Sequence, residues 1–277
     1  MPTIDLSRGP AAVADEVRRA CEDVGFLTVV GHGVDAELIE EVAARSRAFF
    51  ELPDAEKARF RAPAVTPGLP VYRPLGAERL GANADRKASL DWGPSLSGVG
   101  WPSRQLRDSY ERYYAEMLRV AGSLVHSFAL ALGLGEHDLD GFFDDRSSSL
   151  RVIDYPAGAG AARAGAHRDY GCLTIIRSDA AGLEVETRSS EWLPVQAPAS
   201  GFVVNIGDLM QRWTGDRWVS TLHRVVGAES ASPRRQSLVF FHNPRNDAVI
   251  ETLGDGRRYD PVTAGDYVLA RAAEAGL

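Results

Sequence analysis

The stretch His167–Arg177, which reads HRDYGCLTIIR, decides the fold class of this chain. Its second half, Cys172–Arg177, is a short run of apolar and β-branched residues that is typical of a buried strand. Similar runs lie around it, separated by glycine, proline and other turn residues: Leu150–Tyr155, Leu183–Thr187, Trp192–Gln196, Phe202–Ile206, Trp218–Val226, Ser237–His242 and Val249–Thr252. Short strands at this spacing predict a β-sandwich or barrel of the jelly-roll type.

The residues before this region follow another pattern, because their apolar side chains recur mainly at helical spacing. Helices are predicted over Val13–Val24, Ala36–Phe50 and Ser103–Leu134, and short strands over Thr3–Leu6 and residues 25–31. Residues 61–103 are rich in proline and glycine and have no clear periodicity, which predicts a long irregular segment. The chain is therefore expected to be of the α+β class, with N-terminal helices flanking a jelly-roll core.

Composition excludes several classes of protein. The chain has 277 residues, 44% of them hydrophobic and 25% charged, which is typical of a globular protein. A net charge of −7 disfavours a broad nucleic-acid-binding surface. No apolar run is long enough to span a membrane, and the first residues do not resemble a signal peptide. With only Cys21 and Cys172 for disulfides, we expect a cytoplasmic protein without a membrane or nucleic-acid partner.

Three residues are candidates for binding a metal. His167 and Asp169 form an H-x-D motif, and on an extended chain two residues at this spacing point to the same face. His223 lies in a later apolar strand pattern and could supply the third ligand. Two histidines and one carboxylate that leave coordination positions open are typical of non-haem Fe(II) oxygenases. Taken singly, an H-x-D motif arises by chance, and His223 could be an ordinary interior histidine.

The other histidines give weaker signals. His32 lies between two glycines and is expected to have a turn or capping role. His126 lies on the long helix and His137 in a polar loop, and neither has a partner at ligand spacing.

A second group of residues is suited to binding a carboxylate. Arg235 and Ser237 open a strand pattern and share a face, so a guanidinium and a hydroxyl can grip the same anion. Tyr155, at the end of the first strand, could add a phenol donor. The alternative is a surface arginine on an edge strand beside Arg234.

These motifs together resemble the isopenicillin N synthase-like family of Fe(II)/2-oxoglutarate-dependent dioxygenases, over nearly the whole chain. The N-terminal similarity lies in residues 4–6, 20–26, 31–34, 49–53 and 56–57. The later similarity is an ordered series: His167-x-Asp169, residues 204–208, Trp213-Thr214, Ser220-x-x-His223 and Arg235-x-Ser237. One departure is Ile153, where plant members commonly carry asparagine.

The resemblance implies a double-stranded β-helix core, cupin-like, in a single catalytic unit over residues 1–277. Residues 1–103 would form the helical and irregular N-terminal region, 104–149 a supporting helix and loop, and 150–277 the core. It also implies that His167, Asp169 and His223 bind Fe(II), and that Arg235, Ser237 and Tyr155 bind the co-substrate 2-oxoglutarate. With O2, the enzyme would give succinate and CO2.

The resemblance also implies oxidation of a small-molecule substrate. Hydroxylation is the default outcome, with desaturation or ring closure as further possibilities, in specialised-metabolite biosynthesis or on an amino-acid-like compound. A monomer is compatible with the resemblance. The chain has no long C-terminal extension, so the irregular segment 61–103 is the candidate for closing the pocket. Candidate substrate contacts are Tyr72, Arg73, Lys87, Arg151, Arg163, Tyr170 and His242.

Three alternatives remain open at this point. The first is an oxidase of the same family that uses Fe(II) and O2 without 2-oxoglutarate, because such members keep the Arg-x-Ser pair. The second is a non-catalytic small-molecule-binding module on the same scaffold, which intact ligand and anchor residues disfavour. The third is a zinc hydrolase, for which no general base is identifiable near the motif.

Overall fold

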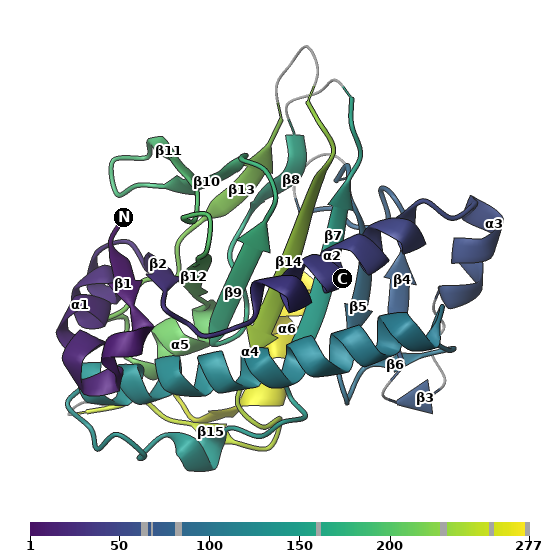
Figure 1. Ribbon diagram of the computed structural model, residues 1–277. Coiled ribbons are helices and arrows are strands. Elements are labelled where there is room, and N and C mark those ends of the chain that lie inside the picture. Colours follow the sequence, from purple (N-terminus) through teal and green to yellow (C-terminus); the bar gives the residue numbers. More distant parts are fainter. Residues whose placement is uncertain are drawn as a thin grey trace.

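A computed structural model of the chain describes residues 1–61, 66–67, 69–80, 85–158, 162–227, 232–254 and 258–274. Its centre consists of two β-sheets (Figure 1). The larger sheet has the strand order β1-β2-β12-β9-β14-β7-β5-β4, and the smaller has the order β11-β10-β13-β8. Apart from the parallel pair β1 and β2, neighbouring strands in both sheets are antiparallel.

The larger sheet combines strands from both ends of the chain. Its members are β1 (Thr3–Asp5), β2 (Phe26–Val30), β4 (Val71–Arg73), β5 (Ala88–Trp92), β7 (Ser149–Tyr155), β9 (Leu173–Ser178), β12 (Phe202–Ile206) and β14 (Arg235–His242). The smaller sheet contains β8 (Ala162–His167), β10 (Leu183–Glu186), β11 (Trp192–Val195) and β13 (His223–Val226). An apolar cluster between the sheets includes Tyr155, Ile176, Val225 and Val239, so this is the interior of the jelly roll.

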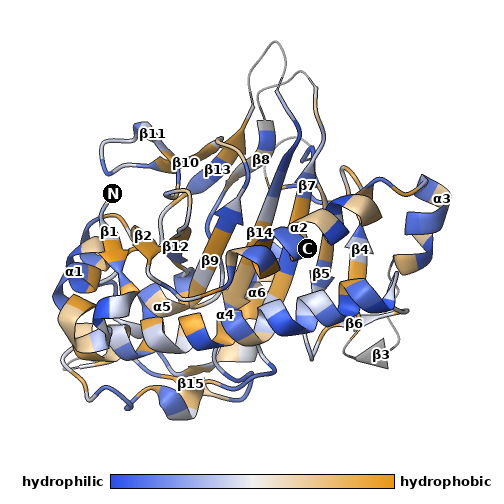
Figure 2. Cartoon of the chain, in the orientation of Figure 1, coloured by the Kyte–Doolittle hydropathy of each residue, from blue (hydrophilic) through white to orange (hydrophobic). Residues whose placement is uncertain are grey.

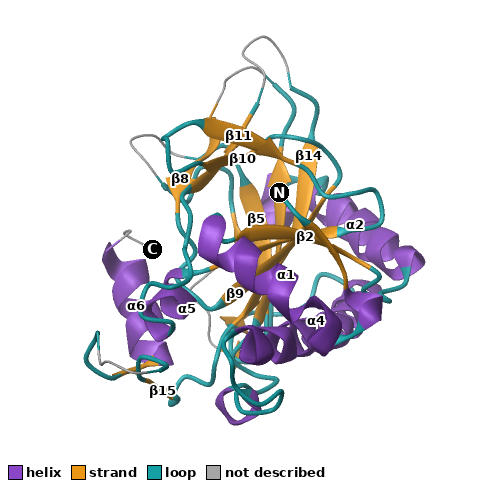
Figure 3. Ribbon diagram, turned by 90° about the vertical axis from the view of Figure 1, so that its left-hand side faces the viewer, coloured by secondary structure: helices purple, strands orange, loops and turns teal. Residues whose placement is uncertain are grey.

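Helices cover the other face of the larger sheet. They are α1 (Pro10–Asp23), α2 (Ala36–Phe50) and the long α4 (Arg104–Ala131), and Figure 3 shows them on one side of the strands. Ser103 is the N-cap of α4, because its hydroxyl accepts a hydrogen bond from the Leu106 N–H in the first turn of the helix. Apolar residues such as Leu124, Phe128 and Phe240 form the larger core between this layer and the sheet. Figure 2 shows the corresponding hydrophobic stretches where β9, β14 and β7 pass behind α4.

The remaining elements are short or lie near the chain's C-terminal end. They are the helices η1 (Leu6–Arg8), α3 (Asp54–Lys57), η2 (Ala58–Phe60), η3 (Asp140–Phe142), α5 (Asp208–Trp213) and α6 (Ala264–Glu274), and the strand pairs β3 (Thr66–Pro67) with β6 (Ser97–Gly98) and β15 (Val249–Ile250) with β16 (Val262–Thr263). Within the described residues, no helix is both long and apolar enough to cross a membrane.

The expectation that residues 61–103 form a long irregular segment is wrong for part of this range. β4 and β5 lie within it and extend the larger sheet next to β7, with Leu90 opposite Val152. All five residues of β5 are buried, so its pattern lacks the alternation that marks a half-exposed strand. Residues 62–65, 68 and 81–84 lie outside the described part.

Other boundaries also differ from the sequence predictions. The strand expected over Trp218–Val226 is formed only from His223 onward, and Val249–Thr252 contributes a two-residue strand outside both large sheets. Strand β8 and helices α5 and α6 were not predicted. Strand β8 was missed by the sequence prediction because its sequence, ARAGAH, has no β-branched residue and no Phe, Tyr or Trp.

Candidate metal centre and active site

Three candidate metal ligands meet at one end of the smaller sheet. His167 ends β8 and His223 begins β13, and the two are direct partners across the strands. Asp169 follows in the turn after β8. The ligand atoms of the three side chains all lie within 4.8 Å of one another. Asp169 Oδ1 is 4.0 Å from His167 Nε2 and 3.8 Å from His223 Nε2.

The surrounding hydrogen bonds orient these atoms toward a common point. His167 Nδ1 donates to the Gly165 carbonyl at 2.8 Å, and His223 Nδ1 donates to the Thr221 carbonyl at 3.1 Å. Because a carbonyl only accepts, each imidazole must carry its proton on Nδ1, which leaves the Nε2 lone pair available. Such outer hydrogen bonds fix the tautomer and orientation of metal-binding histidines.

The Asp169 carboxylate is oriented in the same way. Its Oδ2 accepts hydrogen bonds from Thr174 Oγ1 at 2.6 Å and from Asn205 Nδ2 at 2.7 Å. These bonds leave Oδ1 facing the two imidazoles. Neither Thr174 nor Asn205 was among the predicted site residues, although a polar residue within an apolar strand is the signal that could have found them.

Ionisation of the cluster suits metal binding. Burial lowers the pKa of His167 to about 3, and the neighbouring His223 contributes in the same direction. Burial alone would raise the pKa of Asp169, but His223, His167 and the two hydrogen bonds hold that pKa below its ordinary value. At neutral pH His167 is therefore a neutral imidazole and Asp169 an ionised carboxylate, which are the forms that bind metals.

A buried arginine lies within the same jelly-roll interior. Arg235 is 1% exposed, and its NH1 donates to Ser237 Oγ at 2.6 Å while its Nε donates to the Ala180 carbonyl at 3.1 Å. Tyr155 is its partner on β7, with the ring centroid 5.1 Å from the guanidinium carbon. Among the described residues, no carboxylate makes an ion pair with Arg235. A buried guanidinium without an acidic partner is costly, so this site favours an anionic ligand.

A cavity of about 410 Å³ opens directly at His167. Its lining includes Tyr170 and the arginines Arg79, Arg168 and Arg271. Arg271 also pairs with Asp208 at 2.9 Å, whereas Arg168 donates to the Ser220 carbonyl at 2.8 Å. Arginine side chains therefore line the cavity, and one of the three, Arg271, is already paired with a carboxylate.

Three of the candidate substrate contacts instead form an internal ion cluster. Lys87 Nζ lies 3.0 Å from the Asp85 carboxylate and 3.2 Å from the Glu78 carboxylate. The Asp91 carboxylate forms ion pairs with Arg73 at 2.9 Å and with Arg151 at 2.7 Å. These cations are thus already neutralised by acidic residues of the chain. Asp85 also accepts a hydrogen bond from the Gly165 N–H at 3.0 Å, which connects the cluster to the strand that presents His167.

Two further candidates face the wrong side of the larger sheet. Residues alternate along β14, so Arg235, Ser237 and Val239 face the interior while His242 faces the helices. His242 stacks on Phe143 with a distance of 4.7 Å between the ring centroids. Tyr72 packs on Phe49 in the helix-covered core, with 5.5 Å between the ring centroids. Neither lines the cavity at His167.

Predictions about other residues have different outcomes. His32 accepts a hydrogen bond from the Val34 N–H at 3.1 Å through Nδ1, which confirms its turn role. Arg163 is buried, and its NH2 donates to the Pro233 carbonyl.

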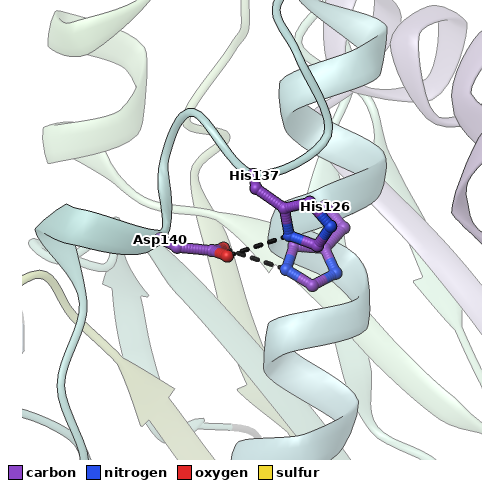
Figure 4. Close-up of side chains that lie close together, drawn as sticks. All are labelled: His126, His137 and Asp140. Atoms are coloured by element: carbon purple, nitrogen blue, oxygen red, sulfur yellow. Dashed lines mark hydrogen bonds and ion pairs between the residues drawn. The ribbon is translucent and has the colours of Figure 1, made fainter.

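The expectation that His126 and His137 lack a partner at ligand spacing is wrong, because both contact Asp140 (Figure 4). Their spacing along the chain hides this contact, which the loop after α4 creates by folding back.

Comparisons with known proteins identify the class. Residues 1–112 match the family described as the N-terminal region of non-haem dioxygenase in morphine synthesis. Residues 146–244 match the 2OG-Fe(II) oxygenase superfamily. A 2-oxoglutarate-dependent dioxygenase, caaD of Aspergillus niger, is 31% identical over 100% of this chain and 96% of its own length. Homoarginine-6-hydroxylase 2-ODD-C23.2 of Arabidopsis thaliana is 30% identical over 88% of this chain and 73% of its own.

Solved structures agree with these relatives. A full-length Neurospora crassa protein, solved in complex with alpha-KG and thymine, has a TM-score of 0.89 and 25% identity, covering 99% of this chain and 96% of its own. A 2OG-Fe(II) oxygenase family protein from Caulobacter crescentus has a TM-score of 0.88 and 27% identity, covering 98% of both chains.

The chain belongs to the 2-oxoglutarate- and Fe(II)-dependent oxygenase superfamily, in its isopenicillin N synthase-like branch. It is an oxidoreductase, a dioxygenase that uses Fe(II), 2-oxoglutarate and O2, and its two sheets form the double-stranded β-helix of these enzymes. The resemblance found in the sequence is thereby confirmed for family, fold and co-substrate.

Proposed function

We propose that His167, Asp169 and His223 bind the Fe(II) of this oxygenase, and that Arg235 and Ser237 bind the distal carboxylate of 2-oxoglutarate. The observation that carries this assignment is the convergence of the two Nε2 atoms on Asp169 Oδ1 within the same interior as the buried Arg235. Two imidazoles and one carboxylate suit Fe(II), and the guanidinium–hydroxyl pair suits a carboxylate.

In this assignment the bound iron and 2-oxoglutarate supply the oxidation, with decarboxylation of the 2-oxo acid to succinate and CO2. The chain supplies orientation and shielding from water. Thr174 and Asn205 hold Asp169, and Arg235 fixes one end of the co-substrate beside Tyr155. The apolar residues between the sheets exclude water from the reacting atoms.

The proposed reaction is hydroxylation, with desaturation or ring closure as variants, of a small molecule in specialised metabolism or of an amino-acid-like compound. The cavity at His167 is the proposed substrate site because it touches a proposed iron ligand. Tyr170, Arg79 and Arg168 suit a substrate with an anionic group, whereas Arg271 is already paired with Asp208. Support for an amino-acid-like substrate comes from a relative named as a homoarginine hydroxylase, and support for a small molecule from the Neurospora crassa complex with thymine.

We also propose that residues 1–277 act as one catalytic unit: an N-terminal region over residues 1–103, a supporting helix and loop over 104–149, and the core over 150–277. Support comes from β1 and β2, which lie in the same sheet as β12, β9 and β14.

The ligand and anchor assignments are tested by adding Fe(II) and then 2-oxoglutarate to the metal-free protein without oxygen. We expect a weak visible charge-transfer band in the wild type and its loss in His223→Ala and Arg235→Ala. Arg234→Ala is the matched control, because Arg234 is the neighbouring arginine but pairs with Asp154 at 2.6 Å and Glu51 at 2.7 Å. The charge-transfer band should remain in Arg234→Ala.

Other outcomes would overturn parts of the assignment. A band that survives in Arg235→Ala would remove the proposed anchor. Iron binding that is unaffected by His223→Ala would place the metal elsewhere in the chain.

A further inference from the structure

A second cluster of metal-binding side chains lies on the helix-covered side of the molecule. Figure 4 shows His126, on α4, and His137, in the loop that follows, both directed at Asp140 at the start of η3. Their ligand atoms lie within 4.8 Å of one another. None of these residues takes part in the proposed iron centre, whose ligands lie on and beside β8 and β13.

The two imidazoles share one carboxylate. His126 Nε2 lies 2.9 Å from Asp140 Oδ1, and His137 Nδ1 lies 2.9 Å from Asp140 Oδ2. In a tetrahedral zinc site, ligand atoms at bond lengths of 2.0–2.2 Å lie about 3.3–3.6 Å apart. Both nitrogen–oxygen distances are shorter than this spacing, so each imidazole must move away from Asp140 by about 0.5 Å to admit an ion.

A further carboxylate is placed to support His126. Its Nδ1 lies 4.0 Å from Glu136 Oε1, whereas its Nε2 faces Asp140. When Nε2 binds a metal, the neutral ring carries its proton on Nδ1, and Glu136 can accept it once the two atoms move from 4.0 Å to a hydrogen-bonding distance. A carboxylate that receives the outer N–H of a metal-bound histidine strengthens the metal–nitrogen bond.

The local charge also favours a cation. A cavity of about 290 Å³ beside the cluster is lined by His126, Asp140, Asp144 and Asp145, and none of the described residues that line it is a lysine or arginine. His126 is partly exposed, and Asp140 and His137 are exposed, so an ion can reach them and water can complete its coordination.

We propose that His126, His137 and Asp140 form a second metal site, separate from the iron centre, that binds Zn(II). Two imidazole nitrogens and one carboxylate are a ligand set that zinc accepts, whereas calcium and magnesium prefer oxygen ligands alone. Zn(II) also binds nitrogen sites more tightly than Fe(II) does. The bound ion would cross-link the C-terminal part of α4 to η3.

The test is a titration of the metal-free full-length protein with Co(II), used as the spectroscopic substitute for Zn(II), without oxygen. We expect two equivalents to bind to the wild type and one to His137→Ala. Asp140→Asn should also lose the second equivalent. Asp145→Asn is the matched control, because it removes the same charge from the same cavity without removing a proposed ligand, and it should keep both equivalents.

A second readout separates this site from the iron centre. Zn(II) should raise the Tm of His223→Ala, whose iron centre is disabled, and should not raise the Tm of His223→Ala/His137→Ala. Equal numbers of Co(II) equivalents in the wild type and His137→Ala, whether one or two, would overturn the proposal. A failure of the iron centre would instead lower the stoichiometry of the wild type and of His137→Ala by one each, and the difference between them would remain.

Discussion

At the residue scale, the orientation of Asp169 depends on hydrogen bonds that a side chain of the same shape cannot replace. Thr174→Val keeps the volume of Thr174 but removes the hydroxyl that donates to Asp169 Oδ2 at 2.6 Å. We expect the Fe(II) affinity to fall by about 10- to 100-fold, as it does when outer partners of metal ligands are lost. Anaerobic titration followed through the 2-oxoglutarate charge-transfer band measures this affinity.

Thr28→Val is the control for this substitution. Thr28 is also buried on the larger sheet, and its hydroxyl bonds to the Pro2 carbonyl at 3.2 Å rather than to the metal cluster. Its Fe(II) affinity should match the wild type. Equal affinities in Thr174→Val and the wild type would show that Asn205 alone holds Asp169.

At the element scale, β5 makes the segment after α3 part of the larger sheet. Leu90 in β5 is fully buried in the core between the sheet and the helices. Leu90→Ala should therefore lower the free energy of unfolding by about 2–5 kcal/mol, from lost burial and the cavity left behind. Urea denaturation measures the change.

Leu75→Ala tests the same segment at a position outside the core. Leu75 is 56% exposed, so its loss should change the free energy of unfolding by less than about 0.5 kcal/mol. Similar effects of the two substitutions would contradict the packing of β5 against β7.

At the scale of the whole molecule, stability should fall in acid because of a histidine in the helix-covered core. Burial lowers the pKa of His242 to about 4, although Asp144 acts in the opposite direction. The unfolded chain takes up the proton near the ordinary pKa of about 6.5, and the folded chain does so only near the lowered value. The free energy of unfolding should thus fall as the pH drops through this window, by roughly 3 kcal/mol from His242.

Urea denaturation of the metal-free protein at several pH values tests this expectation. His242→Gln should show a smaller loss of stability between neutral pH and pH 4 than the wild type. Leu75→Ala is the control, because it removes an exposed side chain with no titratable group and should keep the acid dependence of the wild type. An acid dependence in His242→Gln equal to that of the wild type would show that other groups control it.

Much of the fold was readable from the sequence because its signals are local. Helix α2 was predicted with its observed bounds, and α4 to within a few residues, since helical spacing and caps depend on neighbours along the chain. Strands β7, β9, β12 and β14 were found in the same way from short apolar runs. Strand β8 and the buried β5 were missed, because pairing with neighbours rather than composition makes them strands.

The amino-acid sequence alone was enough to recognise the family and to single out the side chains that we propose carry the chemistry, since the order His167, Asp169, His223, Arg235 and Ser237 is a property of the chain. Only the tertiary structure decided how those side chains lie. It placed Thr174 and Asn205 on Asp169, paired Lys87 and Arg151 with buried acids, and turned His242 toward the helices. It also brought His126 and His137 to Asp140. The physical reason is that these contacts depend on strand register and chain reversal, which join residues that no local pattern connects.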